Sequence, residues 1–162
     1  MTTFLIRDAV RGDMGALRDV FRRSSLSNHG DRANLLAHPD ALELSDLAVR
    51  EGRTRTAVAD GGIVGFATWL GVGDVVELED LFVDPEWMGQ GAGRALVHDL
   101  VAITRKRGAR RIEVTANPHA LAFYERPVSS LAGRSRPGSA RRPGCISRYR
   151  PDLLACGRMM DG

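Results

Sequence analysis

The pattern of hydrophobic and polar residues predicts strands and helices along most of the chain. Residues Thr3–Arg7 form a short β-prone run. A helix should follow, because apolar residues then recur at the i, i+3, i+4 spacing of one buried face, with Asp13 as the expected N-cap. That face consists of Met14, Leu17, Val20 and Phe21. A second, shorter helix is expected at Arg32–Ala37.

Three consecutive strands are predicted in the middle of the chain. Two β-prone runs, Arg55–Ala59 and Ile63–Leu70, flank the turn Asp60–Gly62, whose residue types tolerate positive φ. A second turn, Gly71–Asp74, leads into the strand Val75–Val83. Strands that short turns join pair antiparallel, so this part of the chain should form an antiparallel sheet.

The clearest helix in the pattern begins just after three glycines at alternate positions. Its expected apolar stripe consists of Ala92, Ala95, Leu96, Leu100 and Ile103. Gly108 follows a basic last turn and can adopt the left-handed conformation that commonly ends a helix. The next strand, Arg110–Ala116, should run parallel to Val75–Val83, because a helical crossover joins the two. Asn117 and Pro118 then begin another expected helix.

The charge of the chain is unevenly distributed. The formal net charge is +3. Residues 1–126 carry 16 Lys and Arg against 18 Asp and Glu, a net charge of −2, whereas residues 127–162 carry 7 Arg against 2 Asp, a net charge of +5. The basic excess therefore does not indicate a specific nucleic-acid site on the body of the protein. The last stretch is rich in Arg, Pro, Gly and Ser, and we expect residues 127–162 to be irregular or disordered.

The sequence lacks a membrane signal. No apolar run approaches the roughly 18 residues that span a bilayer, and charge at Arg7 and Asp8 comes too early for the apolar core of a signal peptide. We therefore expect a cytoplasmic protein with no membrane partner. The two cysteines are too few for a disulfide framework or a zinc site, and no metal is expected.

Gly89, Gly91 and Gly93 lie where the strand Val75–Val83 gives way to the helix. Glycines let backbone N–H groups converge and let a ligand approach closely, and the start of a helix favours negative charge. A phosphate or diphosphate is the natural ligand of such a turn. The spacing fits neither a P-loop, which needs Lys and Ser or Thr, nor the G-x-G-x-x-G dinucleotide fingerprint. A nucleotide-binding enzyme remains an alternative.

Two longer stretches resemble a known family. Leu78–Val97, LEDLFVDPEWMGQGAGRALV, and Arg111–Arg126, RIEVTANPHALAFYER, resemble the GCN5-related N-acetyltransferases. The resemblance covers Met1 to about Arg126. The family's loop motif, [Q/R]-x-x-G-x-[G/A], maps onto Met88, Gly91 and Gly93, and Met88 departs from the usual Gln or Arg. The resemblance implies a mixed α/β fold of the GNAT type, in which helices flank a central mixed sheet. The last one or two strands of that sheet are expected to be missing here.

The resemblance also implies an acetyl-CoA site. The diphosphate would bind the turn that consists of Gly89, Gln90, Gly91, Ala92, Gly93 and Arg94. The pantetheine arm would pair like an added strand with the backbone of Leu81, Phe82 and Val83. Asn117 and Tyr124 would lie close to the cofactor.

The implied reaction is direct transfer of an acetyl group from acetyl-CoA to a primary amine in a ternary complex. Glu77 and Glu79 share one face of their strand, and either could serve as the general base. Both also fit an ordinary solvated strand face, so the choice stays open. A backbone N–H near Val83 would stabilise the tetrahedral intermediate, and Tyr124 would protonate the leaving thiolate.

The acceptor is expected to be a small-molecule or peptide amine, and a homodimer is compatible with the sequence. The segment after Arg126 departs from the family's Gly-Phe pair and final strands. Its divergence leaves open a catalytically impaired protein that binds CoA or regulates other proteins.

Overall fold

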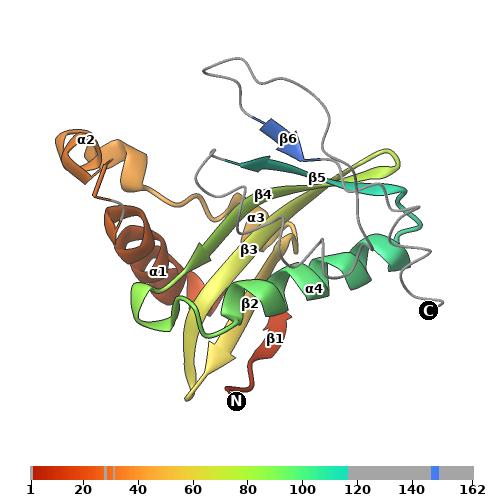
Figure 1. Cartoon of the computed structure of the whole chain (residues 1–162), viewed down its shortest axis with the longest axis horizontal. Coiled ribbons are helices and arrows are strands. Elements are labelled where there is room, and N and C mark those ends of the chain that lie inside the picture. Colours follow the sequence, from red (N-terminus) through yellow and green to blue (C-terminus); the bar gives the residue numbers. More distant parts are fainter. Residues whose placement is uncertain (1, 28, 31, 117–146, 150–162) are drawn as a thin grey trace. The chain divides into compact units, whose positions relative to one another are not determined.

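The computed structural model describes residues 2–27, 29–30, 32–116 and 147–149 (Figure 1). Internal contacts divide the chain into two compact units, residues 1–69 with 80–100 and residues 70–79 with 101–162. The helices are α1 (Met14–Ser27), α2 (Arg32–Ala37), α3 (Leu47–Arg50) and α4 (Ala92–Lys106), with short 3₁₀ turns η1 (Arg11–Asp13), η2 (Pro39–Leu42) and η3 (Pro85–Trp87). The strands are β1 (Leu5–Asp8), β2 (Thr54–Ala59), β3 (Gly62–Val72), β4 (Val75–Val83), β5 (Arg111–Ala116) and β6 (Ser147–Tyr149).

The sheet is mixed, and its strands follow the order β1-β2-β3-β4-β5-β6. β1 pairs antiparallel with β2. β2 pairs antiparallel with β3, as the short turn Asp60–Gly62 predicts. Asp60 and Gly61 have φ values of +50° and +77° in the hairpin turn. β5 runs parallel to β4, which confirms the helical crossover. The expected mixed sheet flanked by helices is therefore confirmed.

β6 consists of three residues of the segment expected to be irregular. It pairs antiparallel with β5, in the register Val114 to Tyr149 and Ala116 to Ser147. These three residues are therefore extended, in contrast to that expectation. The helix expected to begin at Asn117 lies outside the described residues.

The α1 face of the sheet carries the clearest apolar cluster. Ala9, Met14, Leu17, Val20 and Phe66 are buried together, with Phe21 and Phe82 packed against them. The predicted apolar face of α1 is thus confirmed. Side chains alternate along a strand, so Gly65 faces the opposite side of β3 from Phe66. A Cβ on Gly65 would lie 3.5 Å from Leu96 Cδ1, which places α4 on that opposite side.

The start of α1 differs from the sequence prediction, whereas the end of α4 matches it. Asp13 is not the N-cap of α1, because it is the last residue of the 3₁₀ turn η1 that precedes the helix. Instead its carboxylate accepts the Val10 N–H at 2.7 Å and a hydrogen bond from Arg7 at 2.8 Å. The end of α4 is as predicted, since Gly108 has a φ of +66° and its N–H donates to the Arg105 carbonyl.

The buried face of α4 is rotated relative to the predicted stripe. Ala95 and Ile103 are only half-buried. The buried residues are Ala92, Gly93, Leu96, Val97, Leu100, Val101 and Thr104. Asp99 lies on the same side of the helix as Ala95 and Ile103 and forms a two-contact ion pair with Arg55 of β2, at 2.7 and 3.0 Å. A polar contact therefore occupies a side of α4 that the pattern assigned to apolar packing. Burial lowers the pKa of Arg55, but its hydrogen bonds to Asp99 and Asp8 raise that pKa by more.

Candidate functional site

The last residues of β4 continue beyond its parallel ladder. The register with β5 runs from Val75 to Leu78, and Leu81–Val83 follow as half-buried residues. The Asp84 N–H donates to the Val64 carbonyl of β3 at 2.8 Å. Backbone groups alternate in direction along a strand, so the N–H and C=O of Leu81 and Val83 point away from β3. These groups can accept an added extended chain.

Phe82 fixes this segment from the other side. The centroid of its ring lies 4.8 Å from the ring centroid of Phe21, in an edge-on arrangement, and 5.5 Å from the ring centroid of Phe66. Its carbonyl oxygen lies against Gly65 of β3. Phe82 therefore anchors the strand to the core, and the backbone groups of its two neighbours face the opposite edge.

Asp84 follows the last residue of β4 and organises the turn that leads to Gly89. Its carboxylate accepts the Glu86 N–H at 3.1 Å, and its carbonyl accepts the Trp87 N–H at 2.8 Å. Asp84 is 4 % exposed, and Arg23 of α1 pairs with its Oδ2 at 2.6 Å. Sequence reasoning missed this long-range ion pair, although the Asp-Pro dipeptide at the start of η3 marks a capped turn.

The glycine turn leads directly into α4. Gly89 and Gly91 have φ values of +77° and +101°, which L side chains rarely adopt. The Gly91 carbonyl accepts the Ala95 N–H at 3.0 Å, so the turn is continuous with the helix. The N–H groups of the first helical turn have no acceptor within their own helix, and together they carry about half a positive charge. Arg94 adds an exposed guanidinium to the same turn.

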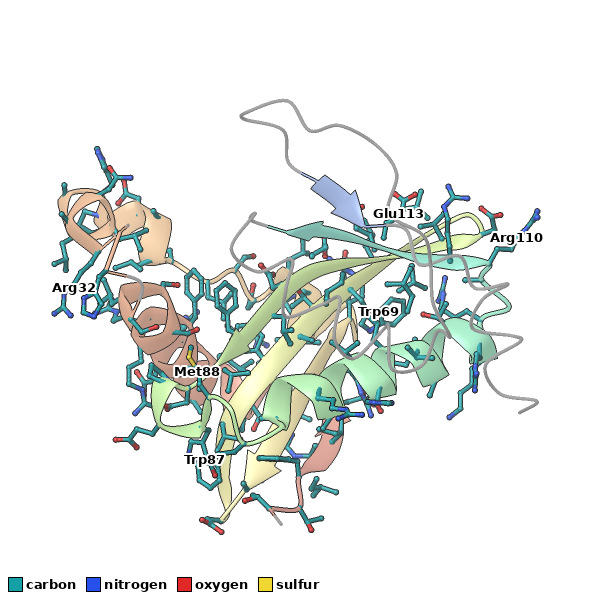
Figure 2. All side chains as sticks on the ribbon, in the orientation of Figure 1. Arg32, Trp69, Trp87, Met88, Arg110 and Glu113 are labelled. Carbon is teal, nitrogen blue, oxygen red and sulfur yellow. The ribbon has the colours of Figure 1, made fainter. Side chains whose placement is uncertain are left out.

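Aromatic packing by Phe4, the residue just before β1, supports the turn. Phe4 and Trp87 lie edge-on with their centroids 6.3 Å apart, and a Cβ on Gly91 would lie 3.8 Å from Phe4 Cε2. Met88, at the position where the family usually has Gln or Arg, is 48 % exposed. Figure 2 shows Trp87 and Met88 leaving this turn in different directions. The side chain of Gln90 folds back and donates to the Glu86 carbonyl at 2.9 Å.

The two candidate bases lie on the part of β4 that belongs to the second compact unit. Glu77 is half-buried, and its register partner on β5 is Glu113, which accepts a hydrogen bond from Arg111 at 2.9 Å. Glu79 is exposed. The structure therefore assigns the glutamates different environments on one strand face. Asn117 and Tyr124 lie outside the described residues.

Asp80 directly follows Glu79 in the sequence, but it points to the opposite face of β4 because side chains alternate along a strand. It is half-buried and accepts a hydrogen bond from the buried Thr68 at 2.5 Å. This contact with β3 engages the Asp80 carboxylate.

Within the described residues, no group of three or more His, Cys, Asp and Glu could hold a metal ion. In the same part of the chain, no helix is long and apolar enough to cross a membrane.

A glycine turn that joins a strand end to a helix start is the geometry expected from the resemblance. Comparison with protein families gives a match to the Acetyltransferase (GNAT) family over residues 16–128. The chain belongs to this family. It is therefore an acyltransferase, and N-acetyltransferase activity of the GNAT type is supported.

Relatives in this family carry different names. The GNAT chain is 30% identical over 123 residues to a glucosamine 6-phosphate N-acetyltransferase of Trypanosoma brucei brucei, which covers 66% of this chain and 84% of that protein. It is 29% identical over 127 residues to the chloroplastic serotonin N-acetyltransferase 2 of Oryza sativa subsp. japonica, covering 75% of this chain and 58% of that protein. These names differ in their acceptor, so the family match does not identify one.

Solved structures share the fold. The PaiA N-acetyltransferase of Thermoplasma acidophilum, solved in complex with coenzyme A, aligns with a TM-score of 0.65 at 19% identity, over 76% of this chain and 87% of that one. The ribosomal-protein-S18-alanine N-acetyltransferase of Escherichia coli aligns with a TM-score of 0.57 at 24% identity, over 76% of each chain. At these identities the likeness shows the fold alone.

Proposed function

We propose that this protein transfers an acetyl group from acetyl-CoA to a primary amine by direct attack in a ternary complex. The observation that carries the proposal is the turn at Gly89–Arg94, where two glycines with positive φ precede the N-terminus of α4. A diphosphate fits this turn, because unpaired N–H groups, the helix dipole and Arg94 all favour an anion. Membership of the GNAT family supports the same ligand.

The pantetheine arm would continue from the turn along the edge of β4 that follows its described register with β5. Leu81 and Val83 are the residues whose backbone groups point away from β3, so they are proposed to pair with its amides, while Phe82 holds the strand in place. The thioester carbonyl would then lie near the Val83 N–H, a donor suited to a developing oxyanion. Asn117 and Tyr124 remain part of this proposal through the family resemblance.

The chemistry requires three proton transfers: the nitrogen loses two protons and the sulfur gains one. Glu79 or Glu77 would take a proton from the acceptor ammonium, directly or through water. The free amine then attacks the thioester carbon, a C–N bond forms, and the C–S bond breaks. Tyr124 would give its proton to the departing CoA thiolate, and the second proton that the attacking nitrogen loses as the amide forms would restore the Tyr124 phenol, directly or through water. The products are an N-acetyl amine and free CoA.

A thiol-release assay tests the proposal. The full chain is incubated with acetyl-CoA and a panel of primary amines that includes glucosamine 6-phosphate, serotonin and peptide N-termini. Release of CoA that depends on both substrates supports the proposal. The proposal would be contradicted if none of the amines in the panel gave turnover and the protein also failed to bind CoA.

A second candidate is a CoA-binding protein that does not turn over. It is favoured by the change in composition after Arg126, close to residue 128, where the family match ends. Binding of CoA without thiol release by any amine distinguishes this candidate from the enzyme. The family match favours both candidates over a nucleotide-binding enzyme. Both candidates predict that NAD and ATP do not compete with CoA for the protein.

A further inference from the structure

We propose that Arg23 positions the glycine turn through its ion pair with Asp84, and is therefore a positioning residue for CoA binding. This inference rests on the proposed function. It concerns an arginine of α1, which no part of the loop motif includes.

Asp84 is the residue through which β4 is connected to the turn. Its N–H bonds to Val64 of β3, and its carbonyl accepts the Trp87 N–H. Its carboxylate accepts the Glu86 N–H through Oδ1 and the Arg23 guanidinium through Oδ2. These contacts fix the backbone direction just before Met88 and Gly89. A change at the carboxylate should therefore be transmitted to the turn that follows.

The carboxylate depends on its cation because it is withdrawn from water. The Asp84 side chain is 6% exposed, and the Arg23 side chain is 56% exposed. A buried carboxylate is costly without a partner, whereas an exposed arginine loses little by itself. Removal of the guanidinium therefore leaves Asp84 with one N–H donor and a strong tendency to reach water. The turn between Asp84 and Gly91 would have to move to let it do so.

The core does not depend on Arg23. α1 is held by Leu17 and Val20, which are fully buried. Replacement of Arg23 by Met keeps the aliphatic stem and removes only the charged group. The fold should therefore survive while the order of the turn is reduced. Arg22 provides a matched control, because it is the adjacent arginine of α1 and is exposed.

The test compares Arg23→Met, Arg23→Lys and Arg22→Met in the full chain. For Arg23→Met, KM for acetyl-CoA and Kd for CoA should rise roughly 3- to 30-fold, the effect of losing one charge-assisted contact, with kcat within about twofold. Arg23→Lys should recover most of the affinity, and Arg22→Met should behave like the wild type. Equal affinities in Arg23→Met and Arg22→Met would overturn the inference.

Hydrogen exchange without ligand separates this inference from the proposed function. Amides of Met88–Arg94 should exchange faster in Arg23→Met than in Arg22→Met, while those of the β2–β3 hairpin remain unchanged. If wild-type protein does not bind CoA, the proposed function fails, and exchange alone decides the role of Arg23. Unchanged exchange at Met88–Arg94 would then overturn it.

Discussion

The carbonyl oxygen of Phe82 lies 3.0 Å from the position that a Cβ on Gly65 would occupy. The same Cβ would meet Val83 Cγ2 at 3.4 Å and Leu96 Cδ1 at 3.5 Å. Gly65 thus allows β3 to lie close to both the end of β4 and the start of α4. These are the two elements that the proposed CoA site requires.

Gly65→Ala should destabilise the protein and weaken CoA binding. The added methyl group must displace the Phe82 backbone, and overpacking of this kind costs about 1–3 kcal/mol. Chemical denaturation measures the loss of stability, and calorimetry measures Kd for CoA. Gly62→Ala is the control, because the nearest atom to its Cβ would be the Ala59 oxygen at 3.9 Å. Equal effects of the two substitutions would refute this explanation.

Gly91→Ala should affect the turn more locally. At a φ of +101° an alanine is strained whatever space surrounds it, at a cost of about 1–3 kcal/mol. The turn should change its conformation to relieve that strain, and Kd for CoA should increase. Gly12→Ala, at a glycine without positive φ and with no atom within 4 Å of its Cβ, should leave Kd unchanged. Wild-type affinity in Gly91→Ala would argue against the turn as the anion site.

Glutamine substitutions distinguish the two candidate bases. The substitution that removes the base should lower kcat by about 100-fold or more, while Kd for CoA remains near the wild-type value. Glu79 is exposed and Glu77 is half-buried, and we expect Glu79→Gln to have the larger effect because its carboxylate reaches solvent and acceptor more readily. Steady-state rates at saturating acetyl-CoA decide between them. Full activity in both variants would exclude either glutamate as the base.

The Arg7–Asp13 contact predicts a dependence of stability on pH. The hydrogen bond from Arg7 is the main cause that lowers the pKa of Asp13, and the Val10 N–H adds to it. The contact therefore stabilises the fold above the unfolded pKa of about 3.9, and this stabilisation is lost as the pH falls through the folded pKa. Asp13→Asn should cost about 1 kcal/mol at neutral pH.

The same variant should be no less stable than the wild type once Asp13 is protonated in the wild type. Urea denaturation at several pH values between neutral pH and about pH 3 measures this difference. Asp19→Asn is the control, because Asp19 is an exposed residue of α1. A stability difference for Asp13→Asn that stays constant over the whole range would contradict the assignment.

Local signals in the sequence predicted much of the fold. The turn at Asp60–Gly62, the helix Arg32–Ala37 and the stop at Gly108 depend on neighbouring residues and on backbone preferences. They are therefore visible in a single sequence. The glycine turn and the start of α4 were predictable for the same reason.

Contacts between distant segments were not predictable in this way. Arg23 and Asp84 are far apart in the sequence, and many arginines could have paired with that carboxylate. The side of α4 that carries Ala95 and Ile103 also carries Asp99, and its ion pair with Arg55 is a contact that the periodicity of one helix does not contain. The family resemblance therefore suggested the proposed ligand, acetyl-CoA. Only the structure shows the long-range contacts that hold the glycine turn.

The central claim is that backbone amides of the glycine turn bind the diphosphate of CoA. Amide NMR of the ¹⁵N-labelled full chain tests it most directly, by titration with CoA and, in parallel, with pantetheine, which lacks the diphosphate. We predict that CoA shifts the amides of Gly89–Arg94 most strongly and that pantetheine leaves them nearly unchanged. Saturating CoA that leaves these amides unmoved, or moves only amides elsewhere, would contradict the account.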